Sequence, residues 1–209
     1  MNVNQNNLPA ELAASITAVL KLKVSKERKE ILQPLIEYIQ KKIKNGEQVN
    51  LNFICTHNSR RSQFAQVWAQ TAANYYGFKV QCFSGGVEVT EFNERAVASL
   101  KRTGFKINTK GSTNPVYQVF NTDGAEPIIA FSKLFDDPVN NAKPFAAVMT
   151  CSHADENCPF IPGTEQRIPV RYDDPKAFDD TDQEADKYDE RSHQIGSEMF
   201  YVFSSINQQ

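Results

Sequence analysis

A polar string runs through residues 55–62: Cys55, Thr56, His57, Asn58, Ser59, Arg60, Arg61 and Ser62. Before it, the apolar side chains of residues 49, 51, 53 and 54 are typical of a short buried strand. After it, apolar and small side chains recur at helical spacing from Phe64 to Tyr75, and Gly77 offers a helix end. The string is therefore predicted to be a loop at the carboxyl end of a strand and the amino end of a helix.

Such a loop is suited to binding an oxyanion. Backbone N–H groups converge on the anion, and the helix dipole adds about half a positive charge. The same field favours the thiolate form of Cys55, so that Cys55 becomes a nucleophile. Arg61 can fold back to hold two oxygens of a tetrahedral anion, and Ser62 can donate a hydrogen bond to the sulfur. The alternative is a buried cysteine at a strand end, with an arginine exposed on the next helix.

The string, continued by Gln63, Phe64 and Ala65, resembles the phosphate-binding loop of the low-molecular-weight tyrosine phosphatase family, in its branch of thioredoxin-coupled arsenate reductases. The resemblance runs from about Val49 to the C-terminus and recurs at residues 83–86, Phe-Ser-Gly-Gly. It implies a three-layer αβα sandwich around a four-stranded parallel sheet. It also implies that residues 56–61 bind the oxyanion. His57 stands where the family usually has glycine, and Arg60 where it has a small residue or cysteine.

A second motif starts at Cys151 and ends with Cys158 and Pro159, after a strand-like apolar run. In the arsenate reductase branch, as the resemblance implies, two such cysteines relay oxidising equivalents away from the nucleophile. If the segment is helical, about seven residues at ~1.5 Å rise place the two α-carbons roughly 10 Å apart. A disulfide needs about 4.4 to 6.8 Å, so the segment would have to unwind. Two unrelated buried thiols are an alternative. A zinc site with Cys151, His153 and Cys158 is another, but it lacks an evident fourth ligand.

A third motif, Tyr172-Asp173-Asp174-Pro175, follows a strand-like run. The resemblance assigns to Asp174 the role of general acid or base, which requires a carboxyl that faces the leaving oxygen. Asp137, also followed by proline, has the same local composition, but the family's acid follows the cysteine pair in chain order. A simple turn is the alternative for either aspartate, because Asp-Pro commonly starts turns.

Composition narrows the class of protein. The 209 residues are 40% hydrophobic and carry a net charge of -2, which predicts one substantial core and argues against a nucleic-acid partner. No apolar run approaches a membrane span, and the first residues lack a signal-peptide pattern, so we expect a cytoplasmic protein without membrane association. Cysteines are reduced there, which suits catalysis. We expect no cofactor or metal, and we interpret Cys82 as an inert core residue.

Residues 1–48 lie outside the resemblance and are predicted to form a helical N-terminal extension of a catalytic domain at 49–209. Apolar residues from Leu12 to Leu20 mark one helix, and those from Ile31 to Ile43 a second helical region. Pro34 predicts either a kink or two shorter helices. The apolar stripes could cover the catalytic domain, form a homodimer or dock a partner.

Two further segments carry apolar residues at regular spacing. Apolar runs at 116–120 and 128–131 flank an Asp-Gly pair and predict a hairpin, which either overhangs the pocket or extends the surface. A closing helix, with Tyr188, Ile195 and Met199 on one face, is predicted to be core packing.

The resemblance implies reduction of arsenate to arsenite, with the Cys151 and Cys158 pair recycled by thioredoxin. One alternative is a tyrosine phosphatase that hydrolyses phosphate monoesters through a phosphocysteine. A non-catalytic oxyanion-binding module is the other.

Overall fold

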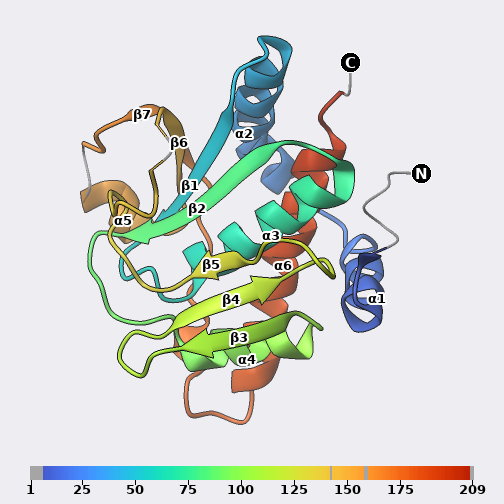
Figure 1. The fold of residues 1–209 in the computed structure, drawn as a ribbon, viewed down its shortest axis with the longest axis vertical. Coiled ribbons are helices and arrows are strands. Elements are labelled where there is room, and N and C mark those ends of the chain that lie inside the picture. The colour runs from blue at the N-terminus through green and yellow to red at the C-terminus, as the bar shows by residue number, and fades with distance from the viewer. Residues whose placement is uncertain (1–6, 142, 158–159, 208–209) are drawn as a thin grey trace.

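The computed structural model describes residues 7–141, 143–157 and 160–207. Its main sheet has four parallel strands in the order β2-β1-β6-β7 (Figure 1). The strands are β1 (Val49–Cys55), β2 (Val80–Gly86), β6 (Phe145–Met149) and β7 (Thr164–Pro169). The predicted four-stranded parallel sheet is therefore confirmed, and Cys55 is the last residue of its first strand.

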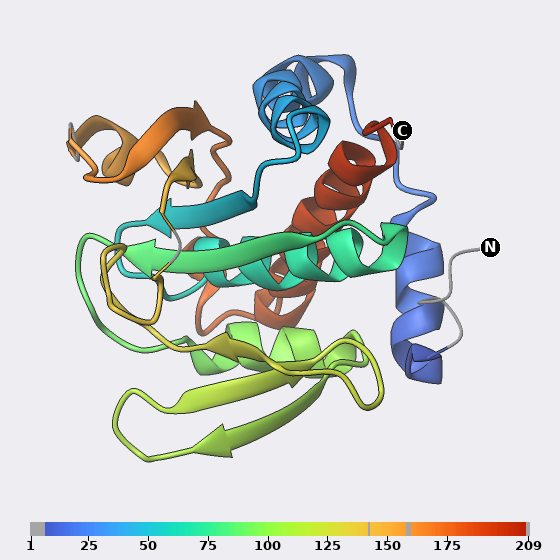
Figure 2. The same ribbon diagram turned by 45° about the horizontal axis from the view of Figure 1, so that its top comes forward.

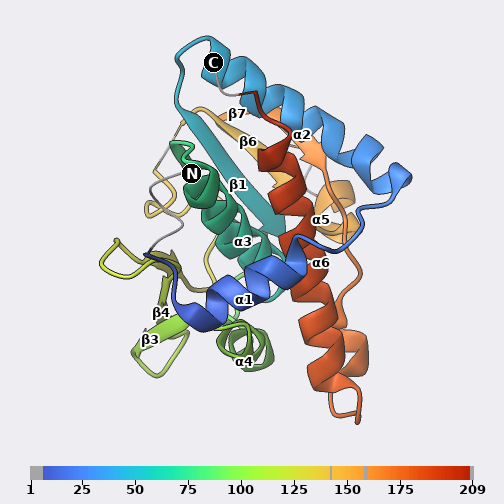
Figure 3. The ribbon, with the colours of Figure 1, turned by 90° about the vertical axis from the view of Figure 1, so that its right-hand side faces the viewer.

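Helices cover both faces of this sheet. On one face α3 (Arg61–Tyr76) and α6 (Glu184–Ser204) lie side by side (Figure 3), and α5 (Ser152–Asn157) lies on the other. Because both faces are covered, every residue of β1 is buried. This is the expected three-layer sandwich.

The contact between α3 and α6 depends on a glycine. A Cβ atom on Gly196 would lie 2.9 Å from ring atoms of Trp68, which is fully buried. The Trp68 indole N–H donates to the Ser192 hydroxyl at 3.0 Å. The apolar face predicted for the closing helix is thus core packing around Trp68.

The N-terminal helices are α1 (Ala10–Val19) and α2 (Lys26–Lys44). α2 runs uninterrupted past the exposed Pro34, so the region is one helix and not two. The apolar side chains of both helices join the core formed by α3, α6 and β1. This packing is what a covering role predicts, whereas a dimer through these helices stays a prediction. None of the described helices is long and apolar enough to cross a membrane.

A smaller antiparallel sheet lies beside α4 (Glu94–Arg102), as Figure 2 shows. Its strands are β3 (Lys106–Lys110), β4 (Val116–Phe120) and β5 (Ile128–Ala130). β4 and β5 form the predicted hairpin. The sequence did not predict β3, because Ile107 is its only apolar residue and most of the strand is exposed.

Candidate active site

The loop between β1 and α3 places a hydroxyl against the Cys55 sulfur. The Ser62 Oγ lies 3.0 Å from the Cys55 Sγ, and the Asn58 side-chain amide donates to the same hydroxyl oxygen at 2.8 Å. Because Ser62 accepts from Asn58, its own proton is left to point at the sulfur. A hydrogen bond in that direction stabilises a thiolate on Cys55.

The carbonyl groups of this loop are held by its surroundings. The Thr56 carbonyl accepts from the N–H groups of Val87 and Glu88, both at 2.9 Å. The next three carbonyls accept, in order, from the Ser132 hydroxyl, the Gln63 amide and the Asn93 N–H. In a trans peptide the N–H of the following residue points the opposite way. The N–H groups of residues 57–60 are thereby directed away from those partners, which is the arrangement that binds an anion.

Two features keep this loop in shape. Asn58 has a φ of 47°, in the left-handed region, and its side-chain oxygen accepts from the backbone N–H of Lys133 at 3.1 Å. Gly86, at the end of β2, passes close to the loop: a Cβ there would lie 2.8 Å from both the Asn58 nitrogen and the Thr56 carbonyl oxygen. The segment at Lys133, which follows the β4–β5 hairpin, therefore stabilises the loop through Asn58.

His57 stands apart from the other loop side chains. It is exposed, and its Nε2 lies 3.1 Å from the Glu88 carboxylate. The left-handed position falls on Asn58, so a side chain is accommodated at 57 without strain. The side chain of Ser59 is buried and is engaged elsewhere, donating to the Glu91 carbonyl at 2.8 Å. Any anion binding by these two residues would involve their backbones.

Arg61 and Asp174 meet at the loop. The Arg61 Nη2 donates to the Asp174 Oδ2 at 2.6 Å, and its Nη1 donates to the Tyr172 carbonyl at 3.0 Å. The other Asp174 oxygen accepts from the Lys176 N–H and caps the 3₁₀ helix η2 (Pro175–Phe178). The Arg61 Nε is buried and has no hydrogen-bond partner among the described residues. Both terminal nitrogens of Arg61 are thus engaged by the segment that carries Asp174.

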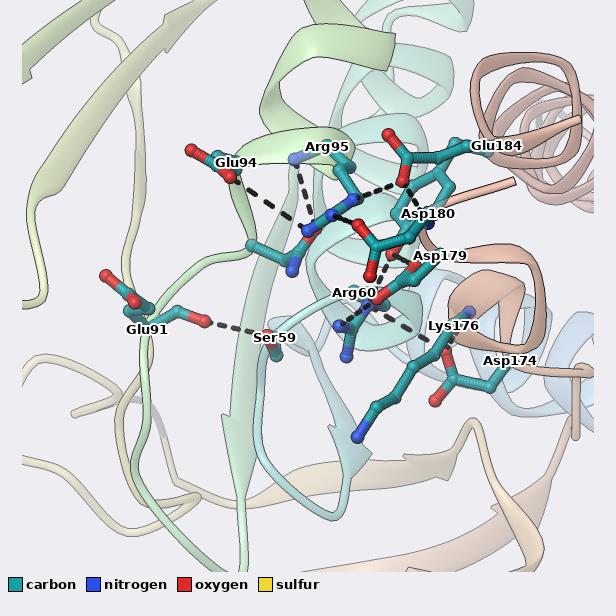
Figure 4. Close-up of polar contacts among 12 residues, drawn as sticks. Ser59, Arg60, Glu91, Glu94, Arg95, Asp174, Lys176, Asp179, Asp180 and Glu184 are labelled. Atoms are coloured by element: carbon teal, nitrogen blue, oxygen red, sulfur yellow. Dashed lines mark hydrogen bonds and ion pairs between the residues drawn. The ribbon is translucent and has the colours of Figure 1, made fainter. Parts of the chain in front are cut away.

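Arg60 turns toward the segment that follows Asp174 (Figure 4). Its Nε donates to the Tyr188 hydroxyl at 2.7 Å, and its Nη2 lies 3.4 Å from the Asp179 carboxylate. Burial, followed by the hydrogen bond to Asp179, raises the pKa of Tyr188, so its hydroxyl stays protonated. Arg60, the departure from the family pattern, therefore links the loop to the segment 174–188.

Arg95 of α4 makes a parallel link to this segment. Its side chain binds Asp180 at 2.7 Å and Glu184 at 2.6 Å (Figure 4). Together, the two arginines fix the segment that carries Asp174.

Cys151 lies at the same loop. Its side chain is buried, and its sulfur is 3.5 Å from the Thr56 hydroxyl oxygen, which is also 3.3 Å from the His153 Nδ1. Cys158 and Pro159 lie outside the described residues, and the segment between the cysteines is helical as α5. Within the part of the chain that the structure describes, no three metal-binding side chains come together.

The remaining sequence candidates lie elsewhere. Cys82 is buried in β2, and burial raises the pKa of its thiol, which fits the inert role expected for it. The Asp137 carboxylate accepts from the Val139 N–H within a turn, as the simpler interpretation predicted.

Three residues that hold the segment carrying Asp174 do not stand out in the sequence. The helical pattern places Tyr188 in the core, and no motif includes Asp179 or Arg95. Their partners are distant in sequence, and no local pattern marks them. The departure at Arg60 was the one available signal.

Comparisons with known proteins give the same family. A family model described as low molecular weight phosphotyrosine protein phosphatase matches residues 50–131. An arsenate reductase of Brevibacillus brevis is 32% identical over 123 residues, which cover 59% of this chain and 74% of that protein. Arsenate reductase 2 of Staphylococcus haemolyticus is 30% identical over 123 residues, or 59% of this chain and 76% of that protein. A low molecular weight phosphotyrosine phosphatase from Vibrio cholerae O395 superposes with a TM-score of 0.49 at 13% identity, covering 75% of this chain and 94% of that one.

Proposed function

The chain belongs to the low molecular weight phosphotyrosine protein phosphatase family, with relatives named arsenate reductase, and from this premise we propose that it reduces arsenate to arsenite. The observation that carries the proposal is the position of Cys151. Its sulfur lies 3.5 Å from the hydroxyl of Thr56, the residue directly after Cys55. Hydrolysis of a phosphate ester needs one thiol at the loop. A second thiol there has no step in ester hydrolysis, whereas arsenate reduction requires one to attack the oxidised nucleophile.

In the proposed reaction arsenate binds to the loop N–H groups of residues 56–61 and to Arg61. The Cys55 thiolate attacks arsenic while Ser62 donates to the sulfur. One arsenate oxygen leaves as water with a proton from Asp174. The Cys151 sulfur then attacks the Cys55 sulfur, and the arsenic leaves as arsenite with the electron pair of the broken sulfur–arsenic bond.

The proposed cycle closes through Cys158. Its thiolate attacks Cys151, frees Cys55 and leaves a Cys151 to Cys158 disulfide for thioredoxin. Because α5 separates the two cysteines, we expect this helix to unwind when the disulfide forms. A reducing compartment such as the cytoplasm would restore both thiols. In this proposal residues 49–209 form the catalytic domain, and residues 1–48 extend it.

The charged rim of the loop supports a small inorganic oxyanion as substrate. The Arg60 Nε lies 4.0 Å from an Asp174 carboxylate oxygen, and the Lys176 side chain extends beside Asp174 in Figure 4. The rings of aryl substrates bind best to apolar and aromatic side chains. Charged groups beside the acid instead favour a compact anion.

The second candidate is a phosphatase. The position of Asp174 beside Arg61 is compatible with it, because a general acid there would serve an ester oxygen as well as an arsenate oxygen. The third alternative, a non-catalytic module, gains no support from relatives that are named as enzymes.

Turnover of Cys151→Ser decides between the two reactions. We expect this variant to lose thioredoxin-dependent arsenate reduction and to keep most hydrolysis of an aryl phosphate. Cys82→Ala is the matched control, since it removes a buried thiol remote from the loop, and it should retain both activities. Cys55→Ser should abolish both. Efficient phosphotyrosine hydrolysis by the unmodified chain, without arsenate-dependent oxidation of thioredoxin, would favour the phosphatase.

A further inference from the structure

One hydroxyl group connects a thiol and an imidazole beside the loop. The Thr56 Oγ lies 3.5 Å from the Cys151 sulfur and 3.3 Å from the His153 Nδ1. A hydroxyl can accept one hydrogen bond and donate another at the same time. With the His153 ring protonated on Nε2, the Cys151 thiol donates to Thr56 and the Thr56 hydroxyl donates to the ring. This arrangement is a path for one proton.

We propose that His153 is the proton acceptor for Cys151, acting through the Thr56 hydroxyl. The inference rests on the proposed arsenate reduction, because only that reaction requires Cys151 to attack. His153 does not touch the reacting sulfur and is a positioning residue for the second chemical step. His153 is exposed, so it can pass the proton on to solvent.

The need for a proton acceptor follows from burial. Cys151 is 1% exposed, so water cannot readily remove its proton. The thiolate is the attacking species in thiol exchange. Without an acceptor, the buried thiol would react slowly near neutral pH.

The proposed step balances as follows. The proton of Cys151 moves to Thr56 as the Thr56 proton moves to the His153 Nδ1. The Cys151 sulfur forms a bond to the Cys55 sulfur, and the bond between that sulfur and arsenic breaks. Arsenic keeps the electron pair and goes from the pentavalent to the trivalent state, while the two sulfurs are oxidised to a disulfide.

The charged side chains of α5 are paired with neighbouring arginines. Arg171, which follows β7, binds Asp155 at 2.5 Å and lies 3.8 Å from the Glu156 carboxylate. Arg167 of β7 binds Asp155 at 2.8 Å. Burial opposes ionisation of Asp155, yet the hydrogen bonds from Arg171 and Arg167 lower its pKa. The two carboxylates of α5 are therefore paired with arginines.

The test is arsenite release in a single turnover of the full chain, without thioredoxin, followed across pH. In His153→Gln a polar ring-sized group remains but cannot take a proton. We expect its rate near pH 7 to fall by roughly 10- to 100-fold, toward the range seen for lost general-base help. The deficit should shrink at alkaline pH, where thiols ionise without assistance. A merely structural role for His153 would give no such recovery.

Two further comparisons sharpen the test. His193→Gln, on α6, is the matched control and should keep both the rate and its pH profile. Thr56→Val should lose the rate as His153→Gln does, and Thr56→Ser, which restores the hydroxyl, should recover it relative to Thr56→Val. Because both changes interrupt one path, the double variant should be no slower than either single variant.

The outcomes separate the inference from the function it rests on. If the unmodified chain releases arsenite and His153→Gln is unimpaired, or is impaired equally at every pH, the role of His153 is overturned and arsenate reduction stands. If the unmodified chain hydrolyses aryl phosphate but releases no arsenite, the proposed function fails and the inference with it.

Discussion

The guanidinium carbon of Arg28 lies 4.8 Å from the centre of the Tyr172 ring. Arg28 belongs to α2, and Tyr172 lies two positions before Asp174. The same guanidinium donates to both oxygens of Glu198, at 2.9 and 2.7 Å, and Tyr172 donates its hydroxyl proton to that carboxylate at 2.8 Å. The Tyr172 carbonyl in turn accepts from Arg61. Helix α2 is thus connected to the loop between β1 and α3 through the segment that carries Asp174.

We expect Arg28→Met to lower the free energy of unfolding by about 3 to 5 kcal/mol, the usual cost of leaving a buried charge without its partner. Glu198 is only 2% exposed, so water cannot replace the arginine. Urea denaturation measures the change. Lys26→Met in the same helix is the matched control. Its partner Glu30 is exposed and 3.9 Å away, so the change should stay within about 0.5 kcal/mol.

A similar loss in both variants would contradict this account of Arg28. The double variant Arg28→Met with Glu198→Gln should recover part of the stability, because the uncompensated charge is gone while the partner of Tyr172 remains.

Gly86→Ala should disable the loop. The added Cβ would lie 2.6 Å from the Glu88 carbonyl oxygen and 2.8 Å from the Asn58 nitrogen, and backbone atoms there cannot yield without moving the loop. We expect aryl phosphate hydrolysis to fall by about 10²-fold, as for a catalytic group displaced by ~1 Å. Gly46→Ala is the control. It has a φ of +69° but nothing within 4 Å, so it should cost stability and not activity. Equal activity in the two variants would contradict the assigned contact.

The sequence predicted the elements whose apolar pattern is dense. β1 is buried along its whole length, and α3 ends at Gly77 with a φ of 77°, as the pattern indicated. β3 was missed because an exposed strand with one apolar residue has no period to detect. A hydrophobic pattern in the sequence therefore identifies a helix or strand only where the side chains of that element are buried.

The same reasoning explains which parts of the site were predictable. Cys55, Arg61 and Ser62 stand in one short string, so their proximity follows from the chain itself. Arg28, Tyr172 and Glu198 are brought together only by the tertiary fold, from three separate regions of the sequence. From the sequence, His153 is predicted only as a candidate metal ligand. The Thr56 hydroxyl that connects it to Cys151 follows β1, far from His153 in the sequence.

Lys133 predicts a specific pH dependence of stability. Its side chain is 2% exposed, and burial lowers its pKa from 10.5 to about 8, although Asp137 opposes the shift. Between these two values the unfolded chain holds the proton and the folded chain does not, so stability rises with pH through this window. Below about pH 8 the charged amine destabilises the fold, by up to about 3 kcal/mol.

Lys133→Met should therefore stabilise the protein at pH 7 and remove that rise. Urea denaturation of both proteins at pH 7 and about pH 10 measures it, and taking the difference between them cancels the titration of all other groups. A stability difference that does not change between the two pH values would show that Lys133 is not a buried charge.

Asp174→Asn tests the acid. The amide keeps the shape of the carboxyl and can still accept from Arg61, but it cannot give a proton to a leaving oxygen. We expect hydrolysis of an aryl phosphate to slow by about 10²- to 10⁴-fold, the usual range for lost general-acid help. Asp137→Asn is the matched control, because that residue also precedes a proline but only stabilises a turn, and it should leave hydrolysis unchanged. Esters with better leaving groups need less proton transfer, so the deficit of Asp174→Asn should shrink as the leaving group becomes more acidic. A deficit that is the same for every leaving group would mean that Asp174 acts only by positioning Arg61.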